Sequence, residues 1–153
     1  MASIKHELWI DAAADAVYKL LGTAAGVSSW WDQQTERQGA DGLIWEHTPG
    51  PEHGTVQFLV TRREHNRVVQ WKCISQHDAS TPASAWTGTV ITFTLADRTA
   101  SKVARAKWAE SIPVQTVLFF SHEGWDEQSP YFGFCNTAWA EVLQKLASTA
   151  SGD

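Results

Sequence analysis

The chain has 153 residues, of which 43% are hydrophobic and 19% are charged, so it has the composition of a folded globular protein and not of a disordered chain. Its 12 basic and 17 acidic residues leave a net charge of −5, which disfavours a broad nucleic-acid-binding surface. No apolar run approaches the roughly 18 residues that a membrane-spanning helix needs, so no membrane span is expected.

The first part of the chain predicts one strand followed by two short helices. Residues 4–10 contain β-branched and aromatic side chains in alternation, which is typical of a strand. Apolar residues at spacings of three and four then predict a helix over residues 13–21, and Gly22 ends it. A second short helix is expected over residues 23–31.

Between residues 32 and 123 the hydrophobic period changes to two. Five alternating runs joined by hairpin-length turns indicate an antiparallel meander. The runs cover residues 43–47, 56–60, 69–73, 91–95 and 116–122. Residues 98–114 do not alternate, and their composition fits either a short helix or an insertion between two strands.

The last segment predicts one long helix. Ser129 is suited to the N-cap and Pro130 to the first helical position. One face of this helix carries Phe132, Asn136, Trp139, Leu143 and Leu146. The helix would be about 30 Å long, and only the sheet offers a surface large enough to cover its apolar face. The sequence therefore predicts a single α+β domain over residues 1–153, in which a twisted antiparallel sheet wraps around the C-terminal helix.

Nine tryptophans are the unusual feature of the composition. Indole rings are bulky and rigid, and they are seldom fully buried because the N–H group needs a partner. Such a set either fills the core or lines a cavity for a small apolar molecule, and we predict a cavity between the sheet and the C-terminal helix. The side chains expected to line it are Trp31, Trp45, Trp71, Phe93, Leu118, Phe120, His122, Phe132, Asn136 and Trp139.

Two of these side chains are polar. His122 shares a strand face with Leu118 and Phe120, so it should point at the helix. There it either contacts a ligand and moves protons, or is a core histidine satisfied by the backbone or by Tyr131, which is the reading we favour. Asn136 needs a ligand, a water or a loop as its partner. No HExxH or CxxC spacing and no glycine-rich phosphate loop is present, so neither a metal nor a cofactor is predicted.

Val117 and Phe119 alternate with these residues and should face the outer side of the sheet. If residues 98–114 leave them uncovered, they form an exposed apolar strip that indicates a homodimer or another partner. If that segment folds over them, no strip remains. The sequence leaves both alternatives open.

The order of the elements resembles that of the START-like helix-grip proteins. Residues 10–18 (IDAAADAVY) resemble the opening strand and helix, and Trp30-Trp31 resembles the aromatic pair after the second helix. Residues 116–125 (TVLFFSHEGW) look like the last strand, and residues 139–146 (WAEVLQKL) look like the final helix. Together these motifs are similar to the homologues of the activator of heat-shock-protein-90 ATPase, within the polyketide-cyclase and lipid-transport superfamily.

The resemblance implies a cavity between sheet and helix, no bound metal and mostly unassigned ligands. We therefore expect a domain that binds a small hydrophobic or aromatic molecule, and we favour this binding role over an enzymatic one. One alternative is a cyclase or hydrolase in which His122, with Glu46 or Asn136, moves protons on a polyketide-like substrate. Another is a co-chaperone that stimulates the heat-shock ATPase, with a role in the stress response. The first residues lack a secretory signal and the two cysteines make no disulfide framework, so a cytoplasmic location is expected.

Overall fold

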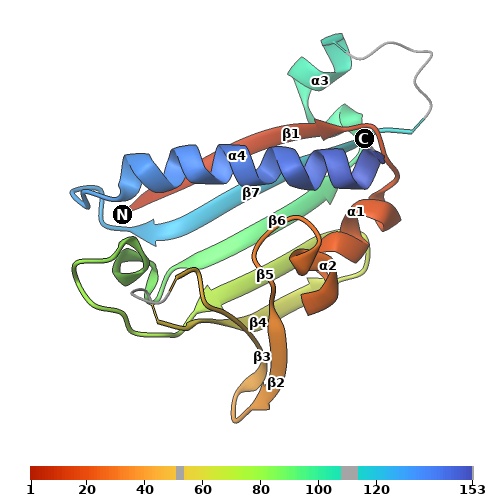
Figure 1. The fold of residues 1–153 in the computed structure, drawn as a ribbon. Helices are drawn as coiled ribbons and strands as arrows, with labels where there is room; N and C mark the ends of the chain where they lie inside the picture. The colour runs from red at the N-terminus through yellow and green to blue at the C-terminus, as the bar shows by residue number, and fades with distance from the viewer. Residues whose placement is uncertain (51–53, 108–113, 153) are drawn as a thin grey trace.

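A computed structural model describes residues 1–50, 54–107 and 114–152 (Figure 1). The strands of these residues are β1 (Ala2–Ile10), β2 (Thr35–Gly39), β3 (Gly42–His47), β4 (Val56–Glu64), β5 (Val68–Cys73), β6 (Val90–Ala96) and β7 (Thr116–Trp125). The helices are α1 (Ala14–Leu21), α2 (Ala24–Ser28), α3 (Lys102–Lys107) and α4 (Phe132–Ser151), with short 3-10 helices η1 (Pro82–Trp86) and η2 (Arg98–Ala100). The strands form one antiparallel sheet in the order β1-β7-β6-β5-β4-β3-β2, and α4 crosses its face (Figure 1). This arrangement confirms the predicted α+β helix-grip fold.

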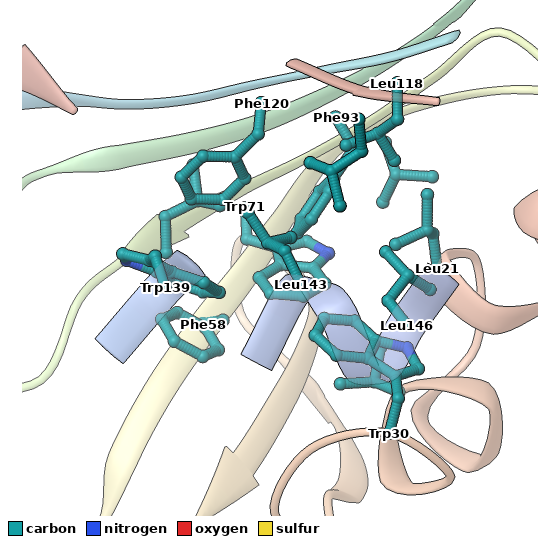
Figure 2. Packing of buried hydrophobic residues seen from close by; sticks show 14 of the residues in the cluster. Leu21, Trp30, Phe58, Trp71, Phe93, Leu118, Phe120, Trp139, Leu143 and Leu146 are labelled. Carbon is teal, nitrogen blue, oxygen red and sulfur yellow. The ribbon is translucent and has the colours of Figure 1, made fainter. Parts of the chain in front are cut away.

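The core lies between α4 and the inner face of the sheet. Because side chains alternate across a strand, β7 turns Leu118, Phe120 and His122 to the inside, where all three are buried. From the other side, α4 contributes the buried side chains Cys135, Trp139, Leu143 and Leu146. Figure 2 shows Trp139 and Leu143 beside the aromatic residues of the sheet, and Leu146 beside Trp30. Fully burying a side chain such as Leu143 or Leu146 stabilises the fold by about 1.5–3 kcal/mol, so this buried face holds α4 on the sheet.

The helix α4 begins two residues later than the sequence predicted. Ser129 and Pro130 lie in a turn before it, where the Ser129 hydroxyl accepts a hydrogen bond from the Tyr131 N–H at 3.2 Å. The register on the core differs as well, because Asn136 is exposed and Cys135 occupies the buried position next to it. The expected place of Asn136 in the interior was therefore wrong. Neither α4 nor any other helix of the described residues is both long and apolar enough to cross a membrane.

One strand was missed altogether. The strand β2 contains only polar residues and glycine, so it shows no hydrophobic alternation. It forms the edge of the sheet and is held by side chains of β3: the Trp45 indole donates to Glu36 at 3.1 Å, and Arg37 pairs with Glu46 at 2.7 Å. The partner strand, not the sequence of β2, explains why these residues are extended.

The segment over residues 98–114 contains the short helices η2 and α3, and residues 108–113 lie outside the described residues. It is tied to the outer face of the sheet by two hydrogen bonds, from the Ser101 hydroxyl to Glu7 at 2.7 Å and from Arg98 to Gln115 at 2.8 Å. On that face Val117 is fully buried and Phe119 is half-buried. Since Val117 is covered, the exposed strip that would have indicated a partner is not present at this position.

Candidate functional site

The predicted lining residues of the sheet and of α4 form a packed aromatic cluster. Ring centroids lie 4.9 Å apart for Trp71 and Phe93, 5.3 Å for Phe93 and Phe120, and 4.6 Å for Phe120 and Trp139. Each of these rings is at most 2% exposed, and Figure 2 shows them in the middle of the sheet–helix interface. Their burial is that of core residues. Ligand contact at these positions stays a prediction.

A pocket of about 340 Å³ opens at one end of this cluster. It lies between the ends of β3 and β4, the 3-10 helix η1 and the first half of α4. Its lining is mostly apolar and consists of Trp31, Asp32, His47, Pro49, Val56, Pro82, Ala83, Trp86, Phe134, Cys135 and Ala138. This volume falls at the small end of the usual range for small-molecule sites. A larger hollow, of about 660 Å³ beside α2, is lined by short or polar side chains and has no aromatic residue in its lining.

Two half-buried indoles form the inner wall of the pocket. Trp86 is stacked on Trp139 with a centroid distance of 5.7 Å and an interplanar angle of 16°. Trp31 lies 6.2 Å from Trp86 and is stacked on the fully buried Trp71 at 6.3 Å and 8°. The Trp86 indole also donates to the Cys135 thiol at 3.4 Å, which joins η1 to α4. The wall is thus held in place from behind by the core.

His47 forms the polar side of the pocket. It is the last residue of β3 and is 5% exposed. Its Nδ1 lies 3.2 Å from Oε1 of Gln34, and its Nε2 lies 3.9 Å from a carboxylate oxygen of Asp32. Burial lowers the pKa of His47 to about 4, an effect that the Asp32 carboxylate opposes and that nearby His77 adds to. The imidazole is therefore neutral at pH 7.

Cys135 is a thiol and not a thiolate at pH 7. Burial raises its pKa above the ordinary value, although the hydrogen bond from Trp86 acts in the opposite direction. Nucleophilic cysteines need a lowered pKa, so this residue serves the pocket as a small apolar wall.

His122 lies behind the pocket wall and is completely buried. Its Nδ1 accepts from the Trp139 indole at 3.1 Å, so its proton is on Nε2, which donates to the Thr89 hydroxyl at 2.7 Å. Thr89 in turn donates to the carbonyl of Trp86 at 2.5 Å. Burial lowers the pKa of His122 to about 3. These contacts support the core-histidine reading, with Thr89 and Trp139 as partners in place of the backbone or Tyr131.

Of the ten side chains predicted to contact a ligand, Trp31 lines this pocket and the other nine do not. Phe132 is half-buried and meets Trp125 edge-on at 5.5 Å, outside the pocket lining. Trp86 was missed because η1 has no hydrophobic period. The high number of tryptophans in the sequence was the one signal that could have indicated it. His47 was not among the predicted ligand contacts, because its neighbours Gln34 and Asp32 come from a loop, and the alternation of β3 does not predict where that loop lies.

No family model matches this chain, and no curated protein matches it. Among solved structures, the Aha1 dimer from Colwellia psychrerythraea is 27% identical over 99% of this chain and 97% of that protein, with a TM-score of 0.73. This chain has an Aha1-like fold.

Other solved structures agree with the Aha1-like fold. A protein from Mesorhizobium loti is 16% identical with a TM-score of 0.70, over 97% of this chain and 96% of its own. CalU16 from Micromonospora echinospora is 16% identical with a TM-score of 0.66, over 99% of this chain and 75% of its own. At such identities these two structures establish the fold alone. The predicted resemblance to the START-like, Aha1-like group is confirmed.

Proposed function

We propose that this Aha1-like chain binds a small aromatic molecule in the pocket between β3, η1 and α4. The observation that carries the proposal is the pair of half-buried indoles, Trp31 and Trp86, that line an apolar pocket of about 340 Å³ while their other faces are packed against the core. Rings that are already fixed lose little conformational entropy when a flat ligand packs on them. Offset and edge-to-face contacts with such rings then favour aromatic ligands over aliphatic ones.

The enzyme alternative loses the residue assigned to it. Both ring nitrogens of His122 are engaged by Trp139 and Thr89, and no part of the side chain is exposed. Proton transfer to a substrate requires that one nitrogen be within reach of it. A binding role for the pocket does not depend on His122.

The expected partners stay predictions. The Colwellia relative is described as a dimer, which supports the proposal of a homodimer for this chain. Analytical ultracentrifugation of this chain tests it. The heat-shock chaperone as a partner rests on the family resemblance alone, and the cytoplasmic location stays an expectation.

The proposal is tested with N-phenyl-1-naphthylamine, a neutral fluorescent probe of apolar sites. We expect saturable binding, detected as energy transfer from tryptophan to the probe. The variant Ala138→Leu should weaken binding at least tenfold, because the three added carbon atoms of the side chain occupy the pocket.

Asn136→Leu is the matched control. It places the same side chain on the same helix at an exposed position outside the pocket lining, so probe binding should be unchanged. The proposal is contradicted if the probe does not bind, or if Asn136→Leu weakens binding and Ala138→Leu does not. The second result would restore Asn136 as a ligand contact.

A further inference from the structure

We infer that the pocket selects neutral aromatic molecules that carry a hydrogen-bond donor, such as a phenol or a ring N–H, and that this donor binds Nε2 of His47. The inference rests on the proposed function, because it names the chemical class of the ligand in the same pocket. It is carried by the hydrogen bonds around His47, which determine its tautomer.

The tautomer follows from the orientation of the Gln34 amide. The Nε2 amide group of Gln34 donates to the backbone carbonyl of Asp32 at 3.0 Å, so its Oε1 is the atom that faces His47. Oε1 is an acceptor only, and it lies 3.2 Å from Nδ1 of His47. The proton of the neutral imidazole is therefore on Nδ1, and Nε2 carries a free lone pair.

Nε2 has no hydrogen-bond partner among residues 1–50, 54–107 and 114–152. The carboxylate of Asp32, which also lines the pocket, has its Oδ2 3.9 Å from Nε2. Two acceptors thus face each other without a donor between them. A hydroxyl or N–H group that enters the pocket supplies the missing proton to Nε2, whereas an aliphatic or ether group leaves the buried Nε2 unsatisfied.

The same geometry disfavours anionic ligands. Burial keeps the pKa of His47 at about 4, so at pH 7 no positive charge is available on the imidazole to bind a carboxylate. The Asp32 carboxylate would repel such a ligand as well. Fatty-acid-like and aryl-carboxylate ligands are therefore the wrong class for this site, although their apolar parts would fit the lining.

Three probes of one shape separate these classes: 2-naphthol, 2-methoxynaphthalene and 2-naphthoate, measured by calorimetry at pH 7. We expect 2-naphthol to bind about tenfold more tightly than the ether, the effect of one hydrogen bond to a group that is otherwise unsatisfied. The additional methyl group of the ether favours the ether by burial, so hydrophobicity cannot produce this order. The carboxylate should bind most weakly.

The variant His47→Phe keeps an aromatic ring but removes the acceptor, and should abolish the preference for 2-naphthol over the ether. His65→Phe is the control, because His65 packs on Tyr18 and does not line the pocket, and it should keep the preference. If His47→Phe does not fold, nitrogen-15 NMR of the wild-type imidazole gives the same information. It should show the proton on Nδ1 and a shift of Nε2 that 2-naphthol causes and the ether does not.

The outcomes separate this inference from the proposed function. If 2-naphthol and the ether bind equally, if the carboxylate binds as tightly as 2-naphthol, or if the proton is on Nε2, the inference is wrong while a pocket for aromatic molecules remains. If none of the three probes binds, both are wrong.

Discussion

The hydrogen bonds of His122 join three parts of the chain. Nδ1 accepts from Trp139 of α4, Nε2 donates to Thr89 just before β6, and the histidine itself belongs to β7. Through Thr89 the same series reaches the carbonyl of Trp86, whose ring lines the pocket. A buried polar network in which every member has a partner stabilises one arrangement of the surrounding core.

Replacement of His122 by phenylalanine should therefore destabilise the protein while keeping a ring of similar volume. The indole N–H of Trp139 would lose its acceptor and Thr89 would lose its donor, both in a site without water access. We expect the free energy of unfolding to fall by about 2–4 kcal/mol, measured by urea denaturation.

Ser121→Ala, at the neighbouring position on the opposite face of β7, is the control and should change the free energy by less than about 0.5 kcal/mol. A fall of less than about 1 kcal/mol for His122→Phe would show that the network contributes little.

The two buried histidines predict how stability depends on pH. The pKa values of His47 and His122 are lowered to about 4 and about 3 in the folded protein, so between these values and 6.5 the unfolded chain binds more protons. Stability is then complete above pH 6.5 and is lost as the pH falls below it. At pH 5 each histidine should lower the free energy of unfolding by about 2 kcal/mol relative to pH 7. Urea titrations at pH 7 and pH 5 measure the loss, and in His122→Phe about half of it should disappear. Equal stability at both pH values would contradict the assigned protonation states.

At the level of elements, the segment of η2 and α3 depends on few contacts. The Ser101 hydroxyl donates to Glu7 of β1 and accepts from the Ala104 N–H at 3.2 Å, the interaction of an N-cap residue. Ser101 is 5% exposed, so these partners are not replaced by water when the hydroxyl is removed.

Ser101→Ala should loosen this segment without unfolding the protein. Loss of a cap costs about 1 kcal/mol, which corresponds to roughly fivefold faster amide hydrogen exchange at Ala104. Ser148→Ala, at an exposed position of α4, should leave the exchange of Ala104 unchanged. If Ser101→Ala also leaves it unchanged, the contact with Glu7 does not hold the segment in place.

Hydrophobic periodicity predicted the elements that bury a face and failed for those that do not. The strands β3 to β7 and the helix α4 were found because their inward residues must be apolar. The strand β2 buries nothing and was missed, since its pairing with β3 supplies its order. The start of α4 was displaced because Ser129 caps a turn and not the helix.

The candidate site was predicted less well than the fold, for a physical reason. Alternation says which side chains point inward, but it does not say which of them meet each other and which stay at an opening. Trp71 and Trp31 were both expected at a ligand, and only the latter lines the pocket. Trp86 and His47 acquire their places from the loops around them, which have no period.

At the level of the whole molecule, the sheet–helix interface has a packed centre and a hollow end. The centre contains fully buried rings such as Trp45 and Trp71, which meet at 5.6 Å. At the end, Trp31 and Trp86 keep one side toward the pocket. Binding should therefore perturb the tryptophans of the end and leave those of the centre and of the far side unchanged.

The most direct test of this account is a titration of the protein with N-phenyl-1-naphthylamine, followed through the indole N–H signals in nitrogen-15 correlation spectra. The account predicts that the signals of Trp86 and Trp31 move in a saturable way. Trp45, which is fully buried in the centre and whose indole donates to Glu36, and Trp9, on the outer face of β1, should not move. Shifts of Trp45 or Trp9 without shifts of Trp86 and Trp31, or no shift at all, would contradict a binding site at the open end.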